Sequence, residues 1–130
     1  MLKIKDIAFT AYPVTDVSRA RAFYSRVLGL KETMAYEFGP GKWWIEYDIG
    51  HGTLALHNIM EPAPEGKGAN IALEVENLDD ALTHFKTLGV APHEIKPGTV
   101  IMDSPACRFF FISDPDGNNI NIHQCKHPAH

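Results

Sequence analysis

Two histidines in this sequence occupy positions from which a side chain can exchange a proton with a bound molecule. His57 and His123 each lie in a segment whose apolar and polar residues alternate, which is typical of a half-buried strand. An imidazole titrates close to neutral pH, so it can act as a general acid or base. We predict that both rings contact a ligand and that one is catalytic. Alternatively, each ring hydrogen-bonds a neighbouring strand or lies at a rim.

Glu74 is the third candidate for acid or base chemistry. Ile71, Leu73 and Val75 alternate with it, so they are expected to face a covering helix while Glu74 faces the other way. A carboxylate on that face can serve as an acid or a base, or it can lie at a solvent-exposed rim.

An aromatic wall for a ligand is predicted on the strand at 42–49. Trp43 and Trp44 point to opposite sides of that strand, so one packs in the core and the other can contact a flat or apolar ligand. Alternation alone does not identify which. Glu46 shares a face with Trp44, where an acid favours a cationic ligand, unless it is simply solvent-facing.

A tight turn positions His123. The Asp-Pro-Asp-Gly sequence at 114–117 is strong turn chemistry, because proline presets one dihedral angle and glycine accepts the left-handed conformation. The flanking segments at 107–112 and 119–125 are predicted to pair as strands. In the second of them Asn121 and His123 share one face, and the isoleucine between them takes the other.

An internal repeat organises the rest of the chain. Residues 7–20 align with residues 68–81 at an offset of 61, and each copy is predicted to open as strand, turn and helix. Asp16 and Asn77 stand at the N-cap position of the two helices, and a Leu-Gly pair closes each one.

Extended segments follow each helix, with a linker rich in proline and glycine at 60–67 between the two halves. We therefore expect one domain over 1–130, built from a module at 1–60 and a module at 68–125. The extended segments are predicted at 42–49, 53–59, 99–102, 107–112 and 119–125.

Composition narrows the class of protein. The chain has 130 residues, a net charge of −4 and 45% hydrophobic residues, which is ordinary for a globular domain and disfavours nucleic acid as a partner. No apolar run is long enough to span a bilayer and no secretory signal precedes the first strand, so we expect a cytoplasmic protein without a membrane partner. Cys107 and Cys125 are expected to be reduced thiols.

The repeated β-α-β-β-β pattern resembles the vicinal oxygen chelate superfamily, which includes glyoxalases, bleomycin-resistance proteins and dioxygenases. The resemblance covers nearly the whole chain. It implies an α+β fold in which two tandem βαβββ modules form curved half-sheets around a cavity, with the helices outside, and it implies a homodimer. The motifs that carry it are Pro-Val-Thr-Asp at 13–16, Ala-Phe-Tyr at 22–24, Val-Leu-Gly-Leu at 27–30 and Asp-Pro-Asp-Gly-Asn at 114–118.

The resemblance also implies four strand positions that commonly offer histidine or glutamate to a divalent metal. Here they are occupied by Phe9, Ala55, Asn70 and Asn121. Phenylalanine and alanine have no lone pair to donate, and amide oxygens are weak neutral donors. We therefore predict that the protein uses no metal and no other cofactor. A displaced site using both histidines would need a third ligand such as Glu74 or Glu46.

We predict a metal-independent member of this superfamily that binds a small aromatic or cationic molecule in the cavity between the modules. The alternative is an enzyme, lyase-like or dioxygenase-like, that acts on a small carbonyl or aromatic substrate with no metal or a displaced one. The catalytic candidates are His57, His123 and Glu74. The ligand-binding candidates are Phe9, Trp44, Glu46, Ala55, Asn70 and Asn121.

Overall fold

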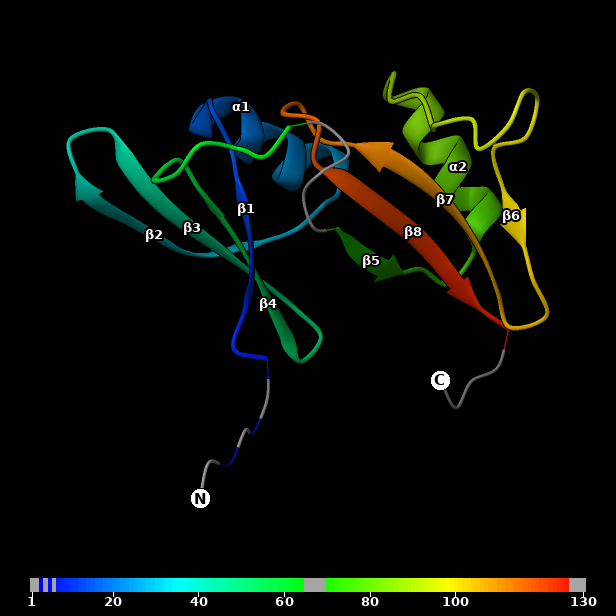
Figure 1. The fold of residues 1–130 in the computed structure, drawn as a ribbon, viewed down its shortest axis with the longest axis horizontal. Helices are drawn as coiled ribbons and strands as arrows, with labels where there is room; N and C mark the ends of the chain where they lie inside the picture. The colour runs from blue at the N-terminus through cyan, green and yellow to red at the C-terminus, as the bar shows by residue number, and fades with distance from the viewer. Residues whose placement is uncertain (1–2, 4, 6, 65–69, 127–130) are drawn as a thin grey trace. The chain divides into compact units, whose positions relative to one another are not determined.

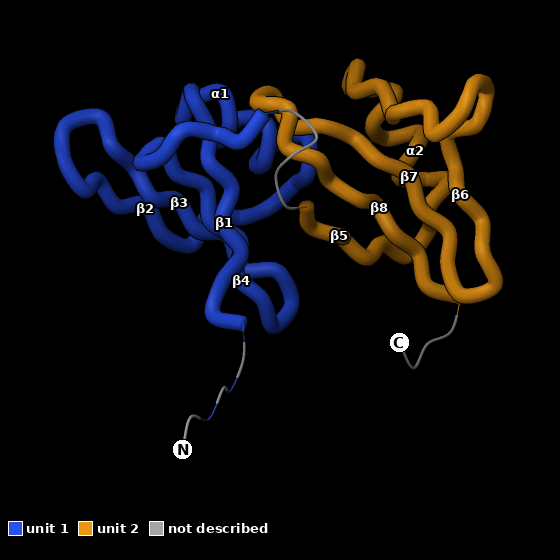
Figure 2. The backbone as a smooth tube through the Cα atoms, in the orientation of Figure 1, with its two compact units in different colours: residues 1–64 blue, residues 65–130 orange. Residues whose placement is uncertain are grey.

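The computed structural model describes residues 3, 5, 7–64 and 70–126. Contacts divide the chain into two compact units, residues 1–64 and residues 65–130 (Figure 2). Each unit contains one four-stranded sheet and one helical segment (Figure 1), which confirms the α+β class and the two repeated modules. The predicted cavity shared by the modules stays a prediction.

The first unit holds a sheet with strand order β1-β4-β3-β2. The edge strand β1 pairs parallel with β4, and the other neighbours are antiparallel. The helical segment begins as an α-helix and continues as one π-helical stretch. The elements are β1 (Thr10–Pro13), α1 (Val17–Ala22), η1 (Phe23–Val27), β2 (Glu32–Gly39), β3 (Lys42–Ile49) and β4 (Gly52–His57).

The helical segment packs on one face of this sheet. Tyr24 of η1 stacks on Tyr47 of β3 with ring centroids 6.0 Å apart, and both rings are buried. The guanidinium of Arg21 lies 6.0 Å from the ring centroid of Trp43. Odd-numbered residues of β3 therefore face the helix, and Trp44 lies on the opposite, helix-free face.

The second unit repeats this plan with strand order β5-β8-β7-β6, in which β5 pairs parallel with β8. Phe85 of its helix packs edge-to-face on Phe110, 6.0 Å away, over a core that also contains Leu78, Ile112, Ile120 and Ile122. Complete burial of each such side chain contributes about 1.5–3 kcal/mol. The elements are β5 (Ile71–Glu74), α2 (Leu78–Thr87), β6 (Met102–Asp103), β7 (Cys107–Ser113) and β8 (Asn119–Cys125).

The two helices begin at equivalent caps, as the sequence repeat predicts. The Asp16 side chain accepts a hydrogen bond from the backbone N–H of Arg19, and the Asn77 side chain accepts one from Asp80. Just before each cap, the chain makes the same strand contact. The N–H of Val14 donates to the carbonyl of His57 at 2.7 Å, and that of Val75 donates to the carbonyl of His123 at 2.8 Å.

The predicted turn at 114–117 forms, and the side chain of its first aspartate stabilises it by hydrogen bonds. Asp114 is buried, and its Oδ1 accepts hydrogen bonds from the backbone N–H groups of Asp116 and Asn118 at 2.9 and 2.8 Å. Gly117 has φ +82°, the left-handed conformation that this turn requires. The Asp114 carboxylate is therefore a structural group of the turn.

Two strand predictions need correction, and one strand had no predicted range. The strand predicted at 53–59 ends at His57, because the Asn58 side chain instead accepts from the N–H of Trp43 and donates to the carbonyl of Gly41. In the segment at 99–102, Thr99 forms only an isolated bridge with Lys96 across the turn at Gly98, and the strand begins at Met102. Strand β2 was not predicted from the sequence. In the described part of the chain, no helix is long and apolar enough to span a membrane.

Candidate functional site

Trp44 is the centre of an aromatic cluster on the helix-free face of the first sheet. It lies directly opposite His57 on the neighbouring antiparallel strand, and the two rings stack with centroids 5.6 Å apart and an interplanar angle of 14°. Phe9 meets the indole edge-to-face at 5.1 Å. The sheet register therefore brings together three of the residues predicted to form the site.

The indole of Trp44 also fixes the nearest carboxylate. Its Nε1–H donates a hydrogen bond to Oε2 of Glu46 at 2.7 Å, from two residues away on the same strand face. Both side chains are half-buried. A charge-assisted bond of this kind places one negative charge beside the aromatic surface, where it can meet a cation.

His57 is the buried end of this cluster, with 9% of its surface exposed. The burial lowers the pKa of its imidazole below the ordinary value of 6.5. The N–H of Ile59 donates to Nδ1 at 3.3 Å, so Nδ1 carries the lone pair and the neutral ring carries its proton on Nε2. His57 therefore suits the role of a hydrogen-bond donor through Nε2 better than that of a general base.

His123 occupies the equivalent place in the second sheet, with a different partner. Its ring stacks on Phe109, directly opposite on β7, at 6.3 Å and again with an interplanar angle of 14°. Nδ1 lies 2.6 Å from Oε1 of Glu74, and the carboxylate oxygen accepts a hydrogen bond from the Nδ1–H group. In the neutral ring Nε2 is then the acceptor nitrogen. The hydrogen-bonding pattern of His123 is thus the reverse of that of His57.

The residue beside each histidine on the neighbouring parallel strand contributes to this difference. In the parallel strand pairs, Pro13 lies beside His57 and Glu74 lies beside His123. Proline offers no side-chain acceptor, whereas Glu74 binds Nδ1 through one carboxylate oxygen and the N–H of Cys125 through the other. The second sheet therefore holds a carboxylate and imidazole pair that the first sheet lacks.

The remaining predicted site residues are Ala55, Asn70 and Asn121. Ala55 has no exposed surface, so it can contribute only to the floor beneath its neighbours. Asn70 lies just before β5 and is exposed. Asn121 lies opposite Phe111, and its Oδ1 is a buried acceptor without a hydrogen-bond partner. An unpaired buried amide oxygen is costly unless something donates to it.

The residues at the four metal-ligand positions do not fit a resident transition metal. On the first sheet Phe9 and Ala55 offer no donor atom, and on the second sheet Asn70 and Asn121 offer only neutral amides. Among residues 3, 5, 7–64 and 70–126, no three His, Cys, Asp or Glu side chains gather where they could hold an ion. Metal independence itself stays a prediction.

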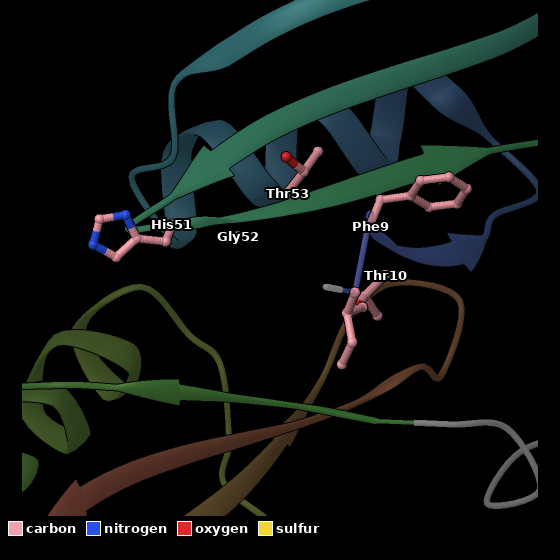
Figure 3. A pocket seen from close by; sticks show the side chains of 6 residues that line it. Phe9, Thr10, His51, Gly52 and Thr53 are labelled. Atoms are coloured by element: carbon pink, nitrogen blue, oxygen red, sulfur yellow. The ribbon is translucent and has the colours of Figure 1, made fainter. Parts of the chain in front are cut away.

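A pocket of about 350 Å³ adjoins the aromatic cluster, with which it shares Phe9 (Figure 3). It lies where the segment before β1 passes the turn between β3 and β4. Figure 3 shows the side chains of His51 and Phe9 on opposite sides of the view, with Thr53 between them. Its volume is at the lower end of the range for small-molecule sites. The lining residues are Ile7, Phe9, Thr10, His51, Gly52 and Thr53.

Sequence reasoning missed several residues of these faces. Tyr36 lies opposite Trp44 and Met34 lies opposite Glu46, so both belong to the aromatic face of the first sheet. Phe38 meets Tyr36 edge-to-face, and both rings are more than half exposed. The alternation of Met34, Tyr36 and Phe38 is a signal that could have found them. His51, in the turn between β3 and β4, is a further residue that lines the pocket.

The fold and the sequence can be placed among known proteins. The model of the Glyoxalase/Bleomycin resistance protein/Dioxygenase superfamily matches residues 6–122. The chain therefore belongs to that superfamily, as the sequence motifs predict. A comparison with curated proteins finds no match.

Several solved structures share the fold. An antibiotic-binding protein from Streptomyces sp. CB03234, TnmS3, has a TM-score of 0.77 and 23% identity, covering 97% of this chain and 100% of that one. An integron cassette protein from V. cholerae has a TM-score of 0.66 and 28% identity, covering 95% and 98%. The fosfomycin-resistance protein FosX from Mesorhizobium loti has a TM-score of 0.69 and 18% identity, covering 93% and 92%.

Proposed function

We propose that this protein binds a small, flat aromatic molecule without a metal, on the helix-free face of its first sheet. The observation that carries the proposal is Trp44, which stacks on His57, contacts Phe9 edge-to-face and donates its indole N–H to the Glu46 carboxylate. Ring stacking supplies affinity for a flat ligand, and the few polar groups fix its orientation.

The polar groups of this face define the chemistry of the ligand. Glu46 favours a cationic or hydrogen-bond-donating substituent, because its carboxylate lies beside the stacking surface. His57, neutral and protonated on Nε2, favours an acceptor such as a carbonyl oxygen. An antibiotic-binding protein has the same fold, which supports a small-molecule ligand.

The test measures the binding of proflavine, a flat aromatic cation, to two variants in which one of the adjacent tryptophans is replaced. Trp44→Leu removes the stacking surface, whereas Trp43→Leu removes a ring on the helix side of the same strand. We expect Trp44→Leu to weaken proflavine binding at least about tenfold and Trp43→Leu to change it less than about twofold. Circular dichroism checks that both variants fold.

The fluorescence of each variant reports on position as well as affinity. In Trp43→Leu the remaining Trp44 should be quenched by proflavine, and in Trp44→Leu the remaining Trp43 should not be. The proposal would be contradicted if both substitutions weakened proflavine binding equally, or if neither substitution changed it. Tetramethylammonium, which has the charge without the rings, should not compete.

A second candidate function rests on the second sheet. The 2.6 Å contact between Glu74 and the Nδ1 of His123 is the arrangement that makes Nε2 a general base. Such a base can remove a proton next to a carbonyl group. Proton exchange at the α-carbon of phenylacetaldehyde in D₂O, followed by NMR, tests it: His123→Gln should reduce the rate to that of buffer. An unchanged rate would exclude this candidate.

A further inference from the structure

Cys107 and Cys125 are brought together by the register of the second sheet. Cys107 is the first residue of β7, Cys125 is the last residue of β8, and the two are direct cross-strand partners. Both side chains are thiols, half-buried, on the same face of the sheet. The Sγ of Cys107 lies 3.5 Å from Oγ of Ser104, and the Sγ of Cys125 lies 3.9 Å from the carbonyl oxygen of Ala106. Both thiols therefore contact the short segment that precedes β7.

The backbone hydrogen bonds show which kind of cross-strand pair this is. The N–H of Lys126 donates to the carbonyl of Ala106, so the next pair along the ladder is a hydrogen-bonded one. The N–H of Cys107 donates to Ser104 instead, and the N–H of Cys125 donates to Glu74. Because the two kinds alternate along an antiparallel ladder, Cys107 and Cys125 form a non-hydrogen-bonded pair.

This kind of pair suits a disulfide. In non-hydrogen-bonded pairs the Cα atoms lie about 4.5 Å apart and the side chains approach more closely. That spacing falls within the range of about 4.4–6.8 Å that disulfides span, so a pair of this kind is compatible with a disulfide. The position at the end of the ladder leaves both thiols within reach of a small reagent.

We propose that Cys107 and Cys125 are a redox-modification site that closes reversibly to an intramolecular disulfide when it meets a small organic disulfide. One thiolate attacks a sulfur of the reagent, forming a mixed disulfide and releasing one small thiol. The second thiolate attacks the protein sulfur of that mixed disulfide and releases the other small thiol. Two protein thiols lose two electrons and two protons, and one small disulfide is reduced to two thiols.

The experiment exposes the folded, reduced protein to glutathione disulfide at pH 8, quenches with acid at intervals and measures the intact mass. We expect the product to lose the mass of two hydrogen atoms, with little accumulated glutathione adduct. Peptide mapping without reductant should join the two cysteine-containing peptides. Closure should be at least about tenfold faster in the folded protein than in protein unfolded by urea, because the sheet holds the thiols together.

The controls move or remove one thiol. Cys107→Ser and Cys125→Ser should each stop at the glutathione adduct. The double variant Cys107→Ser/Arg108→Cys shifts one thiol by a single residue to the opposite face of β7, and it should close at least about tenfold more slowly. Three results would overturn the proposal. The first is a stable glutathione adduct on the wild-type protein, and the second is a disulfide that links two chains. The third is closure in the shifted variant, or in urea, as fast as in the folded wild type.

Discussion

Trp44 and His57 lie opposite each other on antiparallel strands and stack with their rings 14° from parallel. Phe109 and His123 repeat this relationship in the second sheet, with the same interplanar angle. The repeat therefore places one aromatic ring against one imidazole on the helix-free face of each sheet. The two imidazoles nevertheless differ in what surrounds them, and this difference can be measured.

Acid should destabilise the protein through His57. Burial lowers the pKa of His57 in the folded state below its ordinary value of 6.5. The unfolded chain therefore binds more protons between the lowered pKa and 6.5, and stability falls as the pH falls through that window. One such group changes the free energy of unfolding by at most about 1.4 kcal/mol per pH unit.

Urea unfolding of the wild type and His57→Gln between pH 5 and pH 8 measures this effect. The stability of the wild type relative to the variant should decline toward acidic pH and level off above neutrality. A wild type that gains relative stability in acid would contradict the buried, neutral state of His57.

Removal of Glu74 should change which nitrogen of His123 carries the proton. Glu74→Ala deletes the acceptor of the Nδ1 proton and of the Cys125 N–H. Nitrogen-15 NMR of the neutral ring should show a smaller population protonated on Nδ1. Because Glu74 is more than half exposed, the loss of stability should be only about 0.5–1.5 kcal/mol. Glu46→Ala, on the other sheet, is the matched control and should leave the His123 spectrum unchanged.

The two N-caps should contribute similarly to stability. Asp16→Ala and Asn77→Ala each remove a side-chain acceptor from the first turn of a helix. Each should lower the free energy of unfolding by about 1 kcal/mol. Ser18→Ala, within the first helix, should change it by less than about 0.5 kcal/mol. A cap substitution as mild as the Ser18 control would show that this cap does not support its helix.

The protein should retain no transition metal. The four positions at which the family resemblance predicts metal ligands carry Phe9, Ala55, Asn70 and Asn121, which compete poorly with water for an ion. Elemental analysis of protein dialysed without chelator should find less than about 0.1 equivalent of Mn, Fe, Ni or Zn per chain. A stoichiometric amount of any of them would mean that other residues form a metal site.

Local sequence chemistry was enough to predict much of the fold. The caps at Asp16 and Asn77 and the turn at 114–117 depend on residues a few positions apart, and each formed as predicted. Period-2 alternation placed Trp44 with Glu46 and Asn121 with His123 on common faces. Alternation alone does not show which of the two tryptophans faces the helix, because it treats both faces of a strand alike. The positions of Arg21 and Tyr24 in the structure answer this question.

The protonation pattern of the site was beyond the reach of the sequence. It depends on two hydrogen bonds. The N–H of Ile59 donates to His57, and the Glu74 carboxylate accepts from His123 on the neighbouring strand. The partner of Cys107 likewise depends on strand register. Strand β2 was missed because its residues are mostly exposed, although Met34, Tyr36 and Phe38 alternate along it.

The pairing of Pro13 with His57 and of Glu74 with His123 has a consequence for how such a protein can diversify. Both residues end the first strand of a repeat and lie beside the same kind of ring. A carboxylate at this position holds the Nδ1 proton of the ring beside it, as Glu74 does for His123, whereas a proline leaves the tautomer to other neighbours, as the N–H of Ile59 sets it for His57. The same strand position can therefore add an acidic partner to one module of the repeat without a change in the pairing of its strands.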